Sequence, residues 1–317
     1  MDNPTFDEQD ALQFQDSHVL IVGGSGFIGS HLARFFKRGK AFVTSVSLKG
    51  SPPGLVDKAF QVDLARSGDI QNVLQGLAFD YVINAGGYID HTLMRDGGRR
   101  VLEAHFSGLL NLLEGLDRSR LRSFVQIGSS DEYGGNPSPQ QEDQRENPIS
   151  PYSMGKVAAS HFLQMLHRTE QFPAVVVRLF LVYGPGQNPP RFVPQVMRGF
   201  LAGQEINLSP GEQLRDFTYV DDIVRGIVKA VTIPAARGHI INLASGEPLA
   251  IKEVVMLLSR LIGKGRPKFG GIPYRLGENM RLYASIEKAR SILGWAPQIS
   301  LEEGLRLMLL SLSEDRR

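Results

Sequence analysis

The chain of 317 residues contains no cysteine. This absence excludes disulfide bonds, thiolate zinc sites, iron–sulfur clusters and cysteine nucleophiles, and we expect a reducing, cytoplasmic compartment. An excess of one charge is also missing, because 35 lysines and arginines face 33 aspartates and glutamates. A net charge of +2 does not favour nucleic acid or an acidic membrane surface as a partner.

Long hydrophobic runs are absent as well. No apolar stretch approaches the ~18 residues of a membrane-spanning helix, so we expect no membrane partner. The first residues include Asp2, Asp7, Glu8 and Asp10 and lack the basic and apolar regions of a signal peptide. Residues 1–17 are polar and aperiodic, and we predict a mobile N-terminal arm. No metal site is predicted.

From residue 18 onward, short apolar runs alternate with longer segments of helical spacing. Continuous apolar runs are typical of parallel strands that are buried on both faces. Strands that alternate with helices predict an α/β fold with a doubly wound parallel sheet. The expected strands include residues 18–23, 42–47, 79–85, 123–129 and 174–180, and the expected helices include 30–39 and 153–170.

The character of the chain changes after Phe180, because residues 181–216 hold five prolines and five glycines. Strand and helix patterns return further on, at 238–245 and 251–263. We predict a cofactor-binding domain over 18–180, with about 217–247 folding back onto its sheet. A smaller C-terminal substrate-binding domain is predicted over 181–216 and 248–317.

A glycine motif joins the first predicted strand to the first helix. Gly23, Gly26 and Gly29 in GGSGFIG allow a tight turn, a close approach of backbone to a pyrophosphate, and helix–strand packing. This context predicts a Rossmann dinucleotide-binding domain. The predicted cofactor-binding residues are Gly23, Ser25, Gly26, Phe27, Ile28, Gly29, Ser47, Lys49, Asp63, Leu64, Ala85, Gly86, Gly87, Tyr152 and Lys156.

The end of the second strand bears on which dinucleotide is bound. An acid there would accept hydrogen bonds from both ribose hydroxyls and favour NAD(H). This chain has Ser47 and Lys49 instead, which suit a 2′-phosphate. NADP(H) is therefore favoured, and NAD(H) is possible. Alternatively, Ser47 and Lys49 are ordinary exposed loop residues. Asp63 could accept from the adenine amino group, or it could cap the following helix.

Tyr152 and Lys156 lie four residues apart on a predicted helix, and so share one face. An ammonium group beside a phenol favours the phenolate and lowers the phenol pKa. Ser129 and Ser130 end the preceding strand, where a hydroxyl can share the proton. This arrangement predicts a catalytic tyrosine rather than a surface pair.

Together these motifs resemble the extended short-chain dehydrogenases/reductases of the nucleotide-sugar epimerase/dehydratase family. The matching stretches include GGSGFIGSHL (23–32), NAGG (84–87), YSMGK (152–156), RDFTYVDDIV (215–224) and LGWAP (293–297). The resemblance covers residues 18–310 and implies that Ser130, Tyr152 and Lys156 form a catalytic triad. Tyr152 would move the proton of the sugar C4 oxygen while hydride passes between C4 and nicotinamide.

The resemblance also implies a nucleotide-diphosphate sugar as substrate. Arginine forks suit a diphosphate, and surface salt bridges are the alternative for them. The predicted substrate contacts are Tyr88, Arg191, Phe192, Arg215 and Arg275. Asp131 and Glu132 are candidate catalytic residues, because an Asp-Glu pair follows the hydroxyl residue in the family's 4,6-dehydratases. Here Tyr133-Gly134 comes one residue sooner than in those dehydratases, so Glu132 could point elsewhere.

One further residue departs from the family. His105 stands where the family often has asparagine, and we expect it to be a packed helix residue rather than a catalyst.

Three functions remain open from the sequence. The preferred prediction is an NADPH-dependent 4-ketoreductase of a nucleotide-linked deoxysugar, because no acid follows the second strand. The Asp131-Glu132 pair favours a 4-epimerase or 4,6-dehydratase that retains NAD. A non-catalytic NADP-binding regulator is the third reading, against which the intact Tyr152–Lys156 pair argues. The apolar periodicity of residues 98–115, with the helix 153–169, predicts a homodimer.

Overall fold

Seven parallel strands form the central sheet of the protein. The computed structural model describes residues 11–275 and 277–314. In order across the sheet the strands are β3 (Lys58–Gln61), β2 (Phe42–Ser47), β1 (His18–Val22), β4 (Tyr81–Asn84), β5 (Ser123–Ser129), β6 (Ala174–Leu179) and β10 (Ile240–Leu243). The order reverses at β1, which lies between β2 and β4. The doubly wound Rossmann sheet expected from the sequence is confirmed.

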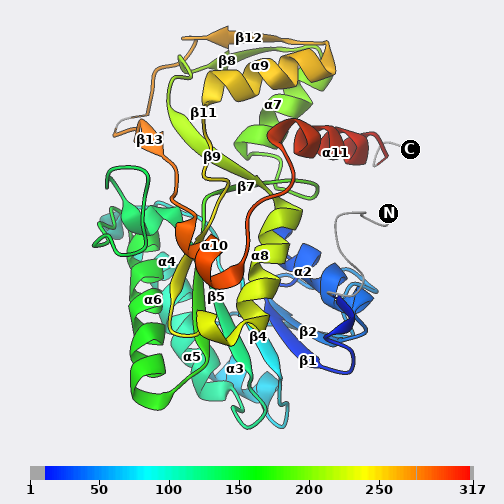
Figure 1. Ribbon diagram of the computed structural model, residues 1–317, viewed down its shortest axis with the longest axis vertical. Coiled ribbons are helices and arrows are strands. Elements are labelled where there is room, and N and C mark those ends of the chain that lie inside the picture. Colours follow the sequence, from blue (N-terminus) through cyan, green and yellow to red (C-terminus); the bar gives the residue numbers. More distant parts are fainter. Residues whose placement is uncertain (1–10, 276, 315–317) are drawn as a thin grey trace.

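Helices cover both faces of this sheet (Figure 1). On one face lie α3 (Ser67–Leu74), α4 (Arg99–Leu102), α5 (Gly108–Gly115) and α6 (Pro151–Glu170); on the other lie α2 (Phe27–Arg38), α8 (Val220–Thr232) and α10 (Glu287–Leu293). The strands are buried between the two layers, which explains why they read as continuous apolar runs.

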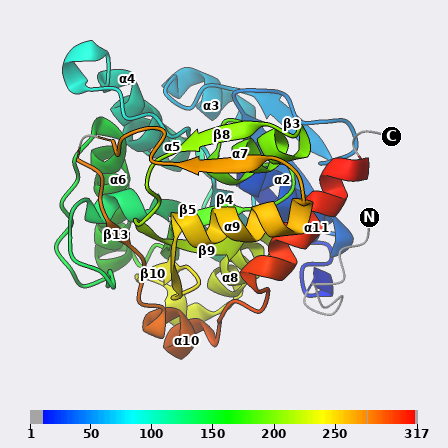
Figure 2. The ribbon, with the colours of Figure 1, turned by 90° about the horizontal axis from the view of Figure 1, so that it is seen from above.

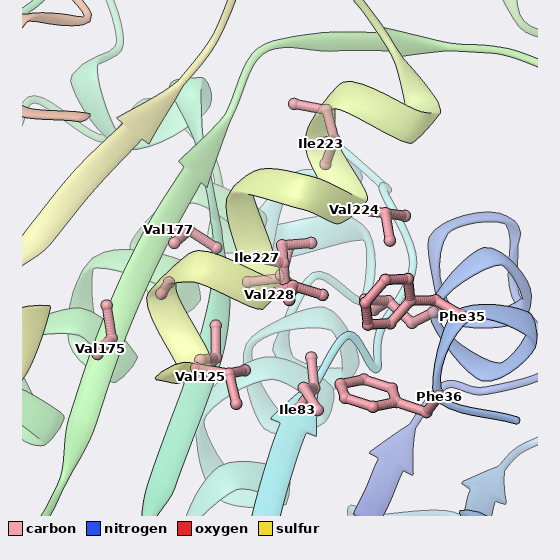
Figure 3. Packing of buried hydrophobic residues seen from close by; sticks show 14 of the residues in the cluster. Phe35, Phe36, Ile83, Val125, Val175, Val177, Ile223, Val224, Ile227 and Val228 are labelled. Carbon is pink, nitrogen blue, oxygen red and sulfur yellow. The ribbon is translucent and has the colours of Figure 1, made fainter. Parts of the chain in front are cut away.

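Helix α8 packs its apolar side onto the middle of the sheet (Figure 3). Ile223, Ile227 and Val228 of α8 belong to one buried cluster with Val125 of β5 and Val177 of β6. Burial of such side chains contributes about 1.5–3 kcal/mol each. Helix α8 follows the sequence region richest in loops, yet it is a main element of the sheet domain.

A second lobe stands above the carboxyl ends of the strands (Figures 1 and 2). Its main sheet contains β7 (Leu181–Tyr183), β9 (Leu214–Tyr219), β11 (Pro248–Ala250) and β13 (Arg281–Leu282), and a separate pair joins β8 (Glu205–Leu208) to β12 (Arg266–Phe269). Helices α7 (Phe192–Leu201), α9 (Ile251–Ile262) and α11 (Leu301–Glu314) pack around them. Residues 217–247 are divided, since β9 belongs to the upper sheet whereas α8 and β10 belong to the central domain.

The described part of the N-terminal segment does not behave as a mobile arm. Ala11 and Phe14 are buried, and the Phe14 ring makes edge contacts with Phe36 at 4.8 Å and with Tyr81 at 5.2 Å. The sequence prediction for residues 1–17 is therefore wrong for residues 11–17. Two apolar residues in a polar stretch are too few to give a periodicity, although they are enough to dock one turn.

No helix within residues 11–275 and 277–314 is long and apolar enough to cross a membrane.

Candidate functional site

A cleft of about 570 Å³ opens at the carboxyl ends of β1, β2 and β4, where the strand order reverses. Ligands of open α/β sheets bind at such switch points. Most of the predicted cofactor-binding residues line it, including Gly23, Ser25, Gly26, Ser47, Lys49, Asp63, Leu64, Ala85, Gly86 and Gly87. Arg66 and Arg100 also line the cleft, and the sequence analysis missed both because isolated arginines carry no motif.

The glycine turn brings the start of α2 to the floor of this cleft. Gly23 has a φ of +78°, and a Cβ there would lie 2.7 Å from the Ala85 carbonyl oxygen. A Cβ on Gly29 would overlap the Gly23 carbonyl. Helix α2 begins after Gly26 with no side-chain cap. The first N–H groups of α2 and its positive dipole thus face the cleft, as a pyrophosphate requires.

At the end of β2 the cleft is lined by hydroxyl groups rather than by a carboxylate. The Ser47 hydroxyl accepts a 3.3 Å hydrogen bond from the Ser25 N–H, and the Ser25 hydroxyl donates to the Lys49 carbonyl at 3.1 Å. Lys49 is exposed and Ser47 is buried. Asp63 lies two residues beyond the end of β3. Its carboxylate accepts a 3.0 Å hydrogen bond from the Ala65 N–H, so it forms a local turn and does not cap α3.

Tyr152 and Lys156 lie in the first two turns of α6, and both are buried. The Lys156 Nζ donates to the Ile127 carbonyl at 2.8 Å and lies 5.9 Å from the centre of the Tyr152 ring. Burial lowers the pKa of Lys156 to about 8, while the charge of Glu132 opposes that shift. Burial also raises the pKa of Tyr152 above its ordinary value. The sequence predicted that Lys156 would lower the phenol pKa, but the pKa of Tyr152 is raised, because desolvation of the phenolate is the largest effect.

The hydroxyl that pairs with Tyr152 belongs to Ser129 and not to Ser130. Ser129 ends β5, and its side chain acts on the phenol to lower the Tyr152 pKa, against the larger effect of burial. Ser130 opens the following 3-10 turn η3 (Ser130–Tyr133). The prediction of Ser130 as the triad hydroxyl is corrected on this geometry. The sequence did contain evidence for Ser129. Because Tyr133-Gly134 comes one residue sooner than in the family's dehydratases, the matching hydroxyl residue is Ser129 rather than Ser130.

Glu132 is fully buried and points away from the cleft. Its Oε1 accepts from the Ser129 N–H at 2.9 Å, and its Oε2 accepts from the Ser160 hydroxyl at 2.8 Å and from Arg178 at 2.9 Å. Arg178 also donates to Glu146 at 2.6 Å. A carboxylate whose two oxygens are both engaged by buried groups of the protein cannot shuttle a substrate proton. The prediction of Glu132 as a catalytic acid or base is therefore wrong.

Asp131 takes the opposite direction and lies beside the phenol. Its Oδ2 is 3.6 Å from the Nε2 of His91, and the His91 ring meets the Tyr152 ring edge-on at 5.7 Å. Burial raises the pKa of Asp131, and the charges of His91 and Arg191 oppose that shift. His91 was not predicted, because it stands alone in a loop without a motif.

His105 packs against the other side of the phenol. Its ring meets the Tyr152 ring edge-on at 4.8 Å, and its Nε2 donates to the Tyr88 carbonyl at 2.8 Å. Burial and the charge of Lys156 lower the pKa of His105 to about 3, so the ring is neutral. The expectation of a buried, packed histidine is confirmed, and the structure adds that its ring contacts Tyr152. It also lies in a π-helical turn, η2 (Glu103–Ser107).

The arginines predicted to contact a diphosphate come together in the upper lobe. Arg215 is buried, pairs with Glu278, and has its pKa lowered by burial and by the charge of Arg275, with Glu278 opposing. Arg191 and Phe192 begin α7. Arg191 is exposed, whereas Phe192 packs on Phe217 at 6.1 Å. Tyr88 is 40% exposed and lines the cleft.

Among the described residues, no group of three or more His, Cys, Asp or Glu side chains is placed to hold a metal ion.

Comparison with known proteins shows which family the chain belongs to. Residues 19–244 match the NAD dependent epimerase/dehydratase family. A UDP-glucuronate 4-epimerase of Thermodesulfobacterium geofontis is 30% identical, covering 91% of this chain and 94% of that protein.

Two solved structures are also similar. UDP-glucose 4-epimerase of Thermotoga maritima with UDP-glucose has a TM-score of 0.86 at 25% identity, covering 95% of this chain and all of that one. UDP-glucuronic acid 4-epimerase of Bacillus cereus, in complex with UDP-glucuronic acid and NAD, has a TM-score of 0.82 at 26% identity, covering 94% and 99%.

Proposed function

Because the chain belongs to the NAD dependent epimerase/dehydratase family, we propose that it is a nucleotide-sugar 4-epimerase that retains its dinucleotide. The observation that carries this proposal is the buried Tyr152, which lies near the Ser129 side chain and Lys156 beside a cleft that suits a dinucleotide. The similar proteins named above are 4-epimerases of UDP sugars.

A bound nicotinamide dinucleotide would supply the hydride acceptor and donor for the sugar C4. Gly23, Gly26 and the first N–H groups of α2 would hold its pyrophosphate. Tyr152 would take the proton from the C4 oxygen and return it, with Ser129 sharing the hydrogen bond. Lys156 would keep positive charge beside the phenol, and Arg215 with Arg275 would contact the substrate diphosphate.

Epimerisation is favoured over 4,6-dehydration because the carboxylate of Glu132 is already occupied by hydrogen bonds within the protein. Loss of water across C5 and C6 needs an acid and a base in addition to the tyrosine. Glu132 accepts hydrogen bonds from Ser129, Ser160 and Arg178, which leaves Asp131 as the acid of that pair beside Tyr152. An epimerase needs neither group for proton transfer.

We further propose that the dinucleotide is NADP(H) rather than NAD(H). Residues 42–51 hold no acid, Ser47 lines the cleft, and Lys49, Arg66 and Arg100 line it as well. Three cations and a hydroxyl suit a 2′-phosphate. The B. cereus structure contains NAD, so this preference would distinguish the chain from that protein.

A 4-ketoreductase that consumes NADPH, the function preferred from the sequence, becomes the second candidate, because the similar proteins support the epimerase alternative better. The same residues at the end of β2 favour it, because a soluble reductant must be bound and released at each turnover. The two functions differ in whether the dinucleotide is net consumed.

The deciding experiment has two parts. Purified protein is denatured, and the released dinucleotide is identified and counted by mass spectrometry. Intact protein is then given UDP-glucose, and UDP-galactose is followed by NMR. We expect close to stoichiometric dinucleotide and an epimer mixture with no net change in reduced nicotinamide. NADPH oxidation by a 4-keto sugar nucleotide, without epimerisation, would instead show the ketoreductase.

Tyr152→Phe is the matched variant, since it removes only the phenol oxygen. We expect it to retain the dinucleotide and to lose turnover at least 100-fold, in line with general acid–base catalysis of about 10²–10⁴. A cellular effect that survives this substitution would favour the regulatory reading.

We also propose a homodimer through α4–α6. Leu93, Met94 and Met154 are exposed apolar residues on or near these helices, and exposed apolar patches mark interfaces. Sedimentation at micromolar concentration should give twice the chain mass, and a monomer would contradict it.

A further inference from the structure

The turn after β5 directs one carboxylate toward the reacting end of the cleft. In that turn, Glu132 is buried and engaged on the far side, whereas Asp131 keeps 32% of its side chain exposed. Asp131 lies 3.6 Å from His91, whose ring contacts Tyr152. The charge of Asp131 acts on the Tyr152 phenol, so the two groups face the same small volume.

An ionised carboxylate accepts hydrogen bonds and donates none. A group of this kind, partly open beside the phenol that handles the C4 oxygen, matches the hydroxyl donors of a neutral sugar. It opposes a second carboxylate, because two like charges that share a partly desolvated site repel more than they do in water.

The nearby basic side chains do not reverse this preference. Arg191 acts on both Asp131 and Tyr152, so its charge is already matched by Asp131. His91 lies on an exposed loop, with 57% of its side chain accessible, and pairs with the same carboxylate. Arg215 is paired with Glu278, and Arg275 belongs to the diphosphate end of the site.

We propose that Asp131, held by His91 beside Tyr152, restricts the substrate to nucleotide-linked hexoses that are neutral around C4, and excludes uronic acids. This inference rests on the proposed function and names its substrate class. It separates the chain from the two uronate 4-epimerases to which it is similar.

The test compares two ligands that differ only at C6. UDP-glucose and UDP-glucuronate are titrated by calorimetry into dinucleotide-loaded wild type, Asp131→Asn and Asp131→Ser. Asp117→Asn is the matched control, since Asp117 lies at the opposite end of the sheet, before β5. Turnover of both sugars is followed in parallel by NMR, and melting curves identify any variant that fails to fold.

We expect wild type and Asp117→Asn to prefer UDP-glucose about tenfold or more. In Asp131→Asn and Asp131→Ser this preference should fall about tenfold, because Arg191 becomes available to a uronate. Equal or tighter binding of UDP-glucuronate by wild type, binding of neither sugar, or an unchanged preference in both folded variants would overturn the proposal. Binding preferences as expected with no epimerisation of either sugar would refute the proposed function and leave the role of Asp131 standing.

Discussion

The Oε1 atom of Glu132 accepts a 2.9 Å hydrogen bond from the backbone N–H of Ser129. This bond fixes the end of β5, where the Ser129 side chain acts on the pKa of Tyr152. The same carboxylate acts electrostatically on Lys156. Glu132 is therefore a positioning residue behind two members of the candidate triad, although it is remote from the substrate.

Replacing Glu132 by glutamine should shift the pH dependence of turnover. The negative charge of Glu132 raises the pKa of Lys156, which burial holds at about 8. Without that charge Lys156 loses its proton at lower pH, so the alkaline limb of kcat against pH should move down by about one unit. Glu114→Gln, on the outer helix α5, is the control and should leave the limb in place. An unmoved limb in a folded Glu132→Gln protein would contradict the coupling.

Lys156→Met should abolish turnover and yet stabilise the fold. The pKa of Lys156 is about 8 in the folded protein, against 10.5 for a lysine in water, so the unfolded chain binds the proton more tightly. The resulting destabilisation is complete below pH 8 and disappears as the pH rises through about 10.5. At pH 7 we expect a gain of about 1–2 kcal/mol, reduced by the lost bond to Ile127.

Urea denaturation at pH 7 and pH 10 measures that gain. The stabilisation by Lys156→Met should be clear at pH 7 and small at pH 10. Lys264→Met, an exposed lysine, should show no such dependence. Destabilisation at pH 7 would mean that the bond to Ile127 outweighs the cost of burying the charge.

Replacing Ser129 should reduce catalysis much more than replacing its neighbour Ser130. Ser129→Ala removes the hydroxyl that lowers the Tyr152 pKa, and we expect kcat to fall about 10- to 100-fold. Ser130→Ala should change kcat by less than about threefold, because Ser129 rather than Ser130 acts on Tyr152. Steady-state kinetics on both variants decides, and a larger loss in Ser130→Ala would restore Ser130 as the triad hydroxyl.

Ser47→Asp should convert the dinucleotide preference. A carboxylate at the end of β2 repels a 2′-phosphate and accepts bonds from the ribose hydroxyls. We expect the affinity for NADP to fall more than tenfold and the affinity for NAD to rise. Lys49→Ala should weaken NADP alone. Fluorescence titration of NADPH and NADH against each variant measures both, and equal losses for the two dinucleotides would speak against the assignment.

The cofactor cleft and the buried Tyr152 could both be predicted from the sequence. Glycine spacing, strand–helix alternation and the Tyr152–Lys156 pair are local patterns, and each corresponds to a local geometry that the fold retains. Gly23 and Gly29 are examples, because only glycine fits between the turn and the strand end.

Other features were decided by contacts between distant segments. Asp131 and Glu132 are adjacent in sequence but face opposite ways, because Arg178, 46 residues later, attracts only one of them. His91 meets Asp131 through a loop with no regular pattern. Phe14 is buried because Phe36 and Tyr81 offer it a site, which the polar residues around it do not reveal.

Strand β10 closes the edge of the central sheet beside β6, although the chain has by then passed through β7, α7, β8 and β9. Helix α8, which covers the sheet centre, also comes after that excursion. A fragment ending near residue 180 would expose an unpaired strand edge and a bare apolar face, and it should aggregate. The upper lobe consequently cannot be exchanged between relatives as one contiguous segment, because chimaeras need at least three junctions: one near residue 180 and one on each side of the segment from α8 to β10.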